Sequence, residues 1–183
     1  MFSIKFILSL ALLVLAGCGS IQDDLLPSGS NKVPAIQPGT TGHSVGQYAP
    51  DFTVSDALGN TITLSSETPA HRGVVLYFTM WCPTCFSEMD IIIRDIIVPL
   101  NTDVVFFAVD YVSGTIQQAR NAQMDNGYDG SGFIVLADIA HTIQNEYNGT
   151  MGKTVVIDKN GIVRMNELFN GGSKLQSVLG GLP

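Results

Sequence analysis

The chain has 183 residues, which is enough for one ordinary domain with a hydrophobic core. Of these residues 45% are apolar, a fraction too high for a disordered protein. Nine lysines and arginines against sixteen aspartates and glutamates give a net charge of −7, and the sequence contains no basic run, so nucleic acid is not expected as a partner. Three cysteines are too few for a disulfide-rich scaffold or a four-cysteine zinc site.

The first eighteen residues have the pattern of an export signal. Lys5 precedes an apolar run, residues 6–16, which is shorter than the roughly 20 residues that a membrane-spanning helix needs. The run ends in Leu15-Ala16-Gly17-Cys18, which resembles the lipobox of bacterial lipoproteins. The resemblance implies cleavage before Cys18, a diacylglyceryl thioether on its sulfur, and N-acylation, so that lipid alone anchors the mature chain. An ordinary signal peptide with an incidental cysteine is the alternative.

The rest of the chain divides into a linker and one domain. After a signal peptide over residues 1–17, residues 18–45 are rich in Gly, Ser, Pro, Asn, Gln and Thr, which predicts a flexible linker. Residues 46–183 form the predicted domain. We expect this domain in the bacterial cell envelope, outside the cytoplasm and on the periplasmic side of a Gram-negative cell, where disulfides can form and persist.

From residue 46 onward, short strands alternate with helices. The predicted elements, in chain order, are a β-hairpin over 51–54 and 61–64, a strand at 73–79, a helix at 83–98, a strand at 104–109, a helix at 115–125, a strand at 133–136, a helix at 139–147, a second hairpin over 154–157 and 162–168, and a helix over 173–179 that Ser173 caps. This order predicts an α/β fold with an N-terminal β-hairpin and a central mixed, mainly parallel sheet flanked by helices.

The cysteine pair Cys82-Pro83-Thr84-Cys85 follows a predicted buried strand directly and opens a predicted helix. Cys82 stands where free backbone N–H groups and the positive end of the helix favour a thiolate, which is the attacking form of a thiol. Cys85 lies one turn inside the helix and is expected to be more buried and less acidic. We therefore expect Cys82 to attack a partner disulfide and Cys85 to resolve the mixed disulfide, while Pro83 stiffens the turn.

Three other uses of the pair are compatible with the sequence. They are a stable structural disulfide, half of a zinc site, and a soft-metal site that binds Cu(I) with help from a methionine. No second Cys-x-x-Cys or Cys/His pair follows in the sequence, which argues against zinc. A redox pair fits best, because strand, Cys-x-x-Cys and helix in this order are typical of redox motifs. We expect no cofactor other than the redox-active disulfide Cys82–Cys85.

Three segments carry a family resemblance. They are residues 46–53 (GQYAPDFT), residues 77–85 (YFTMWCPTC) together with Glu88, and residues 155–161 (VVIDKNG). In these segments the chain resembles the TlpA-like thiol–disulfide oxidoreductases of the thioredoxin superfamily, which are related to the AhpC/TSA peroxidases. The resemblance runs from about residue 46 to the C-terminus and implies a thioredoxin-like fold.

The resemblance also implies roles for single residues. Cys82 matches the attacking cysteine, Cys85 the resolving cysteine, and Trp81 the tryptophan that shields the pair. Glu88 matches an acidic residue that lies about one helical turn beyond Cys85, where a carboxylate could relay the proton of the resolving thiol. A merely favourable charge in the first half of the helix is the alternative for Glu88.

One position departs from the family pattern. Six residues before Asp158, where the family has a cis-proline that meets the partner chain, this sequence has Gly152. A cis bond without proline costs about 2.5–4 kcal/mol, so we expect a trans or otherwise reshaped loop. We expect Met151 and Gly152, together with Trp81 and Pro83, to contact the substrate. With both cysteines, Met151 is also the methionine that a Cu(I) site would use.

The predicted function is that of a membrane-anchored, extracytoplasmic thiol–disulfide oxidoreductase. Its expected partners are exported cysteine-containing proteins, an unidentified membrane thiol protein that donates electrons, and the lipid bilayer through acylated Cys18. The resemblance favours reduction, as in cytochrome c maturation or general thiol repair. Two alternatives are a peroxiredoxin-like thiol peroxidase, since Thr79 lies three residues before Cys82 as in that relative, and a non-enzymatic Cu(I)-binding carrier lipoprotein.

Overall fold

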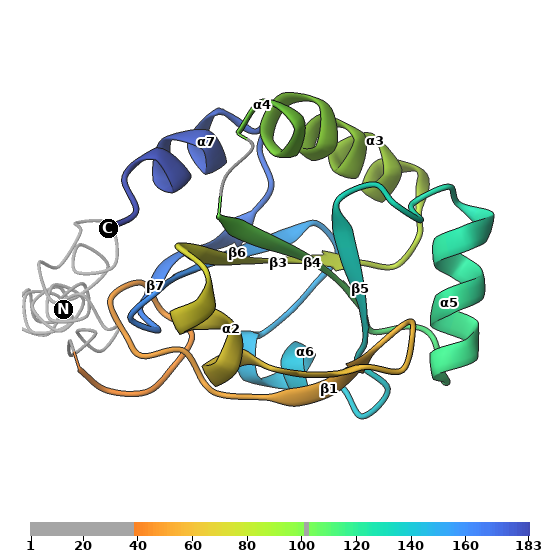
Figure 1. The fold of residues 1–183 in the computed structure, drawn as a ribbon, viewed down its shortest axis with the longest axis horizontal. Coiled ribbons are helices and arrows are strands. Elements are labelled where there is room, and N and C mark those ends of the chain that lie inside the picture. The colour runs from red at the N-terminus through yellow and green to blue at the C-terminus, as the bar shows by residue number, and fades with distance from the viewer. Residues whose placement is uncertain (1–38, 101–102) are drawn as a thin grey trace, which may run out of the picture. The chain divides into compact units, whose positions relative to one another are not determined.

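A computed structural model describes residues 39–100 and 103–183 of the chain (Figure 1). The predicted signal peptide, Cys18 and most of the predicted linker lie outside the described residues. The described part of the linker contacts the domain. The backbone N–H of Tyr48 donates to the Thr40 carbonyl, and the Asn166 side chain donates to the carbonyl of His43.

The described strands form one seven-stranded sheet in the order β2-β1-β5-β4-β3-β6-β7. The strands are β1 (Thr53–Asp56), β2 (Thr61–Thr63), β3 (Gly73–Thr79), β4 (Val104–Asp110), β5 (Phe133–Ala137), β6 (Lys153–Asp158) and β7 (Val163–Leu168). Only β3 with β4 and β4 with β5 pair in parallel, whereas the other four pairs are antiparallel. The α/β fold with a mixed sheet is confirmed. The expectation that the sheet is mainly parallel is wrong, because the C-terminal hairpin adds to β3 antiparallel and β1 does the same at β5.

Helices cover both faces of this sheet. They are α2 (Leu64–Ala70), α3 (Pro83–Ile92), the π-helical turn η1 (Ile93–Ile97), α4 (Val98–Leu100), α5 (Ile116–Asp125), α6 (Thr142–Tyr147) and α7 (Ser173–Gly180). Figure 1 shows α3, α4 and α7 on one face, α2 and α6 on the other, and α5 beside β5. Among the helices of the described part, none is long and apolar enough to cross a membrane.

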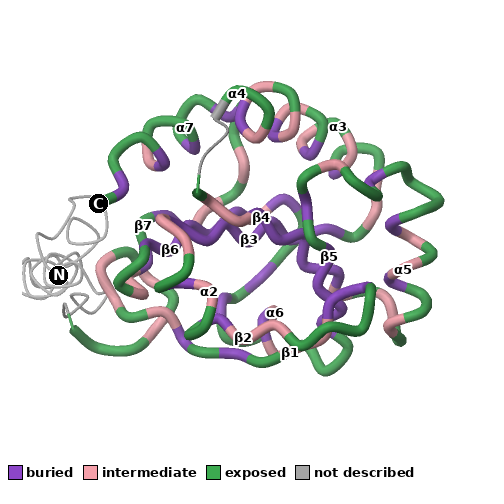
Figure 2. Tube along the Cα trace, viewed as in Figure 1, coloured by how far each residue is buried: buried purple, intermediate pink, exposed green. Residues whose placement is uncertain are grey.

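The strand β3 lies at the centre of the buried structure. All seven of its residues are buried, and the central strands stand out as the buried part of the chain in Figure 2. Successive side chains point to opposite faces, so Val75 packs with Ile92 and Leu175 while the adjacent Leu76 packs with Ile143. Burial of each such side chain contributes about 1.5–3 kcal/mol. The end of β3, from which the cysteine pair follows, is therefore held firmly from both faces.

Three further details differ from the prediction. Helix α2, which has Pro69 inside it, was not predicted, because its polar sequence LSSETPA lacks an apolar period. Ser173 does not cap α7. Gly172 occupies the N-cap position with a positive φ of 82°, and Ser173 is the first helical residue.

The helix after the cysteines also continues beyond its expected end at residue 98. The π-helical turn η1 and the short α4 carry it to residue 100, past Pro99. Pro99 has no N–H to donate to the carbonyl of Asp95 one turn earlier. That carbonyl instead accepts a hydrogen bond of 2.8 Å from the Gln176 side chain of α7, so the proline is accommodated without leaving the carbonyl unpaired.

Candidate active site

The cysteine pair lies at the turn from β3 into α3. Cys82 is the N-cap of α3, with an extended backbone at φ −97° and ψ 162°, and Pro83 is the first helical residue. The Cys82 Sγ accepts a hydrogen bond of 3.2 Å from the backbone N–H of Cys85. One of the free N–H groups of the helix start therefore points at Cys82, as the sequence predicts.

The two sulfurs differ in access. Both cysteines are free thiols in this structure, and their Sγ atoms lie 2.7 Å apart. Cys85 is fully buried, whereas Cys82 is partly exposed. A disulfide needs the sulfurs about 2.05 Å apart, so a small movement would join them. Only Cys82 presents its sulfur to a partner, and Cys85 is within reach of it.

The acidity of the two thiols is the reverse of the sequence expectation. Burial and the hydrogen bond with Cys85 raise the pKa of Cys82, and the N–H groups of Cys85 and Thr84 offset this only in part. Burial also opposes ionisation of Cys85, but the hydrogen bond from Cys82 and the N–H groups of Met80 and Cys82 outweigh it, so the pKa of Cys85 is lowered. The expectation that Cys85 is the less acidic thiol is wrong, because backbone N–H groups of the turn also donate to the buried sulfur of Cys85.

Trp81 is anchored beside the pair. Its backbone is left-handed, with φ 55°, and its N–H donates to the Thr79 hydroxyl at 3.1 Å. The indole Nε1 donates to Oδ2 of Asp110 at 2.8 Å, and the ring packs on Tyr128 with the centroids 6.0 Å apart. A non-glycine residue in this conformation costs free energy and persists only where its surroundings hold it. The indole hydrogen bond and the ring contact supply that support.

Glu88 is part of a polar pair beneath the cysteines. The Tyr77 hydroxyl donates to Glu88 Oε2 at 2.6 Å. Burial, followed by this hydrogen bond, raises the pKa of Tyr77 far above its ordinary value, and the charges of both cysteines add to the shift. Tyr77 thus lies within electrostatic range of both sulfurs. The preceding residue, Leu76, is also fully buried, but its side chain packs on the opposite face of the sheet from Tyr77.

Met151 and Gly152 lie on the loop between α6 and β6. The Cys82 thiol donates to Sδ of Met151 at 3.2 Å, and the Met151 side chain is 40% exposed. The peptide bonds of this loop are trans, which confirms the expectation, and Gly152 has a positive φ of 75° that glycine adopts without a Cβ penalty. The Gly152 N–H donates to the Phe78 carbonyl, and its own carbonyl accepts from the Phe169 N–H. The loop is thereby fixed against the end of β3.

Several polar residues around the cysteines were missed. They are Asp110, which holds the indole, the phenols of Tyr77 and Tyr128, and Tyr111, whose pKa burial and the cysteine charges raise. Thr79 was singled out only for the peroxidase alternative, and its hydroxyl helps to lower the pKa of Cys85. Thr79 and Asp110 are the last residues of β3 and β4 and lie opposite each other. A polar residue at the carboxyl end of an otherwise apolar parallel strand was the signal that could have found them.

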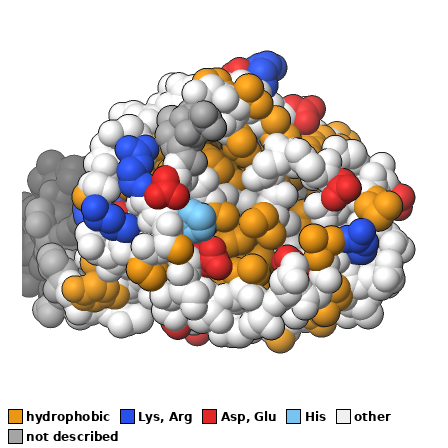
Figure 3. All heavy atoms as spheres, viewed as in Figure 1, with side chains coloured by type: hydrophobic (Ala, Val, Ile, Leu, Met, Phe, Trp, Pro, Cys, Tyr) orange, Lys and Arg blue, Asp and Glu red, His pale blue; other side chains and the backbone are white. Residues whose placement is uncertain are grey.

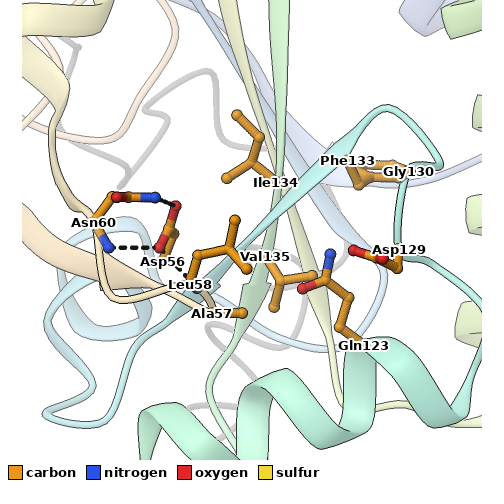
Figure 4. A pocket seen from close by; sticks show the side chains of 10 residues that line it. All are labelled: Asp56, Ala57, Leu58, Asn60, Gln123, Asp129, Gly130, Phe133, Ile134 and Val135. Atoms are coloured by element: carbon orange, nitrogen blue, oxygen red, sulfur yellow. Dashed lines mark hydrogen bonds between the residues drawn. The ribbon is translucent and has the colours of Figure 1, made fainter.

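A cavity of about 340 Å³ lies away from this site, between the β1–β2 turn, α5 and the start of β5 (Figure 4). Figure 4 shows Gln123 and Asp129 on one side and Asp56 with Asn60 on the other. The Asp56 carboxylate already accepts hydrogen bonds from its own turn. Hydrophobic side chains gather near the centre of the face shown in Figure 3. None of the sequence-predicted site residues lines the cavity, so we place no chemistry there.

The peroxidase alternative needs a cation beside the attacking sulfur. Three of the four arginines are engaged elsewhere, Arg72 with the Leu179 carbonyl, Arg94 with Asp95 and Arg164 with Asp158, and Arg120 lies on α5. The described arginines thus give this alternative no support.

Comparison with known proteins agrees with the fold. A family model described as Redoxin matches residues 44–178. A solution structure of a candidate protein disulfide isomerase from Bacteroides thetaiotaomicron is 25% identical, with a TM-score of 0.61 over 74% of this chain and 86% of that chain. A secreted disulfide oxidoreductase of Mycobacterium tuberculosis, homologous to E. coli DsbE, is 18% identical (TM-score 0.55; 72% and 96% covered). The peroxidoxin BcpB of the same organism is 19% identical (TM-score 0.56; 74% and 94% covered). The last two show the shared fold. A comparison with curated proteins gave no match.

Proposed function

Since the chain belongs to the Redoxin family and is a thioredoxin-like thiol–disulfide oxidoreductase, we propose that it reduces disulfides in exported proteins while anchored to a membrane outside the cytoplasm. Cys82 attacks the substrate disulfide, forms a mixed disulfide and releases one substrate thiol. Cys85 then attacks Cys82 Sγ, releases the second substrate thiol and leaves a Cys82–Cys85 disulfide. Two electrons pass to the substrate in each cycle, and a membrane thiol protein returns them.

The observation that carries this proposal is the pairing of an accessible sulfur with a buried one at 2.7 Å. Cys82 is accessible to a substrate disulfide and Cys85 is buried, which supports the attacking role for Cys82 and the resolving role for Cys85. The Met80 and Cys82 N–H groups and the Thr79 hydroxyl lower the pKa of Cys85 against the effect of burial. They stabilise the Cys85 thiolate that resolves the mixed disulfide. Glu88, hydrogen-bonded to Tyr77, is the proposed acceptor of the proton that Cys85 loses.

Reduction of insulin disulfides by the full chain, with dithiothreitol as the electron source, tests this mechanism. We expect activity in the natural chain and none in Cys82→Ser, because the accessible nucleophile is lost. Cys85→Ala should accumulate covalent complexes on Cys82 with exported proteins, because nothing resolves them. Cys85→Ala with Cys82→Ser is the matched control and should trap nothing. Full activity of Cys82→Ser would overturn the assignment.

The anchor is a separate part of the proposal. Cys18 at the end of the lipobox-like segment is the proposed site of acylation, and two or more acyl chains would hold the domain stably at a bilayer. Growth with a labelled fatty acid should label the natural chain in a bacterial host, whereas Cys18→Ser should stay unlabelled and leave the membrane fraction. Equal labelling of both chains would contradict the proposed anchor.

The contact of Met151 with Cys82 favours one second function, Cu(I) binding without catalysis. Two thiolates and a thioether are ligands that suit Cu(I), and Sδ of Met151 lies 3.2 Å from Cys82 Sγ. Competition of the reduced protein with a chromophoric Cu(I) chelator tests this function. We expect Met151→Leu to weaken binding and Cys82→Ser to abolish it, and failure of the reduced natural chain to compete would end this alternative.

A further inference from the structure

The contact between Met151 and Cys82 joins two oxidisable sulfurs at the mouth of the site. The Cys82 thiol donates to Sδ of Met151 at 3.2 Å, and Cys85 Sγ lies 2.7 Å behind Cys82 Sγ. Each of these three sulfurs thus contacts the next, from the 40% exposed thioether of Met151 to the fully buried thiol of Cys85. Disulfide reduction as described above uses only the second and third of them.

Met151 is open to oxidation in this position. Peroxides and hypohalous acids convert exposed methionine to its sulfoxide, which is polar and chiral. Of the described methionines, Met89 and Met165 are buried, whereas Met80, Met124 and Met151 are at least 40% exposed. A sulfoxide at Met151 would set an electrophilic sulfur against the nucleophile Cys82, and a sulfoxide at Met124 on α5 would not.

We propose, building on the proposed function, that the Cys82–Cys85 pair reduces the sulfoxide of Met151 within the same molecule. Cys82 Sγ bonds to Sδ of the sulfoxide, and the S–O bond breaks as the oxygen takes the two thiol protons and leaves as water. The thiolate of Cys85 then attacks Cys82 Sγ, and the Met151 thioether leaves with its electron pair. The sulfoxide gains two electrons, the two thiols lose them as the Cys82–Cys85 disulfide forms, and one water is released.

The structure gives this reaction its advantage through proximity. The attacking sulfur already touches the atom that would carry the oxygen, so no encounter is needed. The loop is fixed by the two backbone hydrogen bonds of Gly152, which hold Met151 over Cys82. The cysteine pair that reduces substrates would therefore also convert an oxidised Met151 back to methionine. Each repair would consume two electrons from the electron donor.

The test begins with the full chain in its disulfide form, which protects the thiols. Hydrogen peroxide or hypochlorite oxidises the exposed methionines, the oxidant is removed, and dithiothreitol then opens the disulfide. Peptide mass mapping follows the extra oxygen at Met151 and, as internal control, at Met124. We expect the oxygen to leave Met151 on the order of 100-fold faster than Met124, because the reacting sulfurs are held in contact.

Controls separate this reaction from chemical reduction. The same oxidised protein without dithiothreitol should keep both sulfoxides. Cys82→Ser, with Cys85 capped as a methyl disulfide during oxidation, should keep the Met151 sulfoxide after dithiothreitol. Equal persistence at Met151 and Met124, equal loss at Met151 in Cys82→Ser, or resistance of Met151 under conditions that oxidise Met124 would each overturn the proposal.

An insulin-reduction assay on the same preparation distinguishes failure of the Met151 repair reaction from failure of the proposed function. Insulin reduction with a persistent Met151 sulfoxide overturns the repair reaction alone. Loss of the Met151 sulfoxide without insulin reduction supports repair and overturns the proposed function alone.

Discussion

A methyl group at position 152 should destabilise the protein more than the same methyl group at position 161. Both glycines have a positive φ, 75° at Gly152 and 76° at Gly161. A Cβ added at Gly152 would lie 2.8 Å from Oε2 of Glu88, whereas one added at Gly161 would meet nothing within 4 Å. Gly161→Ala is therefore a control matched to Gly152→Ala in backbone strain.

The difference between the two variants follows from the hydrogen bond that Glu88 makes. The left-handed backbone costs each alanine roughly 1–2 kcal/mol. Alanine also lowers the conformational entropy of the unfolded chain, which offsets about 0.4–1 kcal/mol of this destabilisation in each variant. Only Gly152→Ala also displaces Glu88, whose Oε2 accepts from Tyr77 at 2.6 Å. Tyr77 is fully buried, so its unpaired hydroxyl would add about 1–3 kcal/mol to the loss.

Urea unfolding of the reduced variants measures this difference. We expect the free energy of unfolding to fall by about 1–3 kcal/mol more in Gly152→Ala than in Gly161→Ala. The difference should vanish when both substitutions are made in a Tyr77→Phe background, because no hydroxyl is then left unpaired. Equal losses in the two single variants, or a difference that survives Tyr77→Phe, would refute the assignment of the Glu88–Tyr77 pair.

Three further predictions concern the same layer. Trp81→Phe removes the donor to the buried Asp110 and should lower the free energy of unfolding by about 1–3 kcal/mol in a denaturant titration; unchanged stability would show that the indole bond is dispensable. Cys85→Ala removes the sulfur whose hydrogen bond and charge help to raise the pKa of Cys82, so thiolate absorbance should give Cys82 a lower pKa in the variant than in the natural chain. A higher value would contradict the influence of the Cys85 sulfur on Cys82. Burial and its hydrogen bond raise the pKa of Tyr77, so the phenol stabilises the fold only while protonated, and stability should fall as the pH rises above the ordinary tyrosine pKa of about 10. The fall should be less steep in Tyr77→Phe, and identical slopes would count against a buried phenol.

The elements of the sheet could be predicted because their signals are local. The apolar run of β3, the Asn160-Gly161 turn and the Gly59 turn each mark a structure within a few residues. The direction of pairing is not local. Whether the last hairpin joins β3 or β5 depends on packing over the whole sheet, so the sequence order favoured parallel pairing too strongly.

The two cysteines could also be predicted, since strand, Cys-x-x-Cys and helix follow one another directly. Their surroundings could not, because the partners come from distant positions. The indole of Trp81 reaches Asp110 across 29 positions of sequence, and Met151 lies 69 positions from Cys82. Tyr77 is fully buried in the core, and its hydroxyl meets Glu88 there.

Access and ease of ionisation differ between the two sulfurs, and in the proposed reaction this difference orders the two steps. The pKa is lowered at the buried Cys85 and raised at the accessible Cys82, so ionisation is favoured at the sulfur that a substrate cannot reach. The two sulfurs lie 2.7 Å apart, close enough for a proton to pass from one to the other. Once Cys82 is bound in a mixed disulfide, it can no longer hold that proton. The donors around Cys85 then favour its thiolate again, so resolution follows attack rather than competing with it.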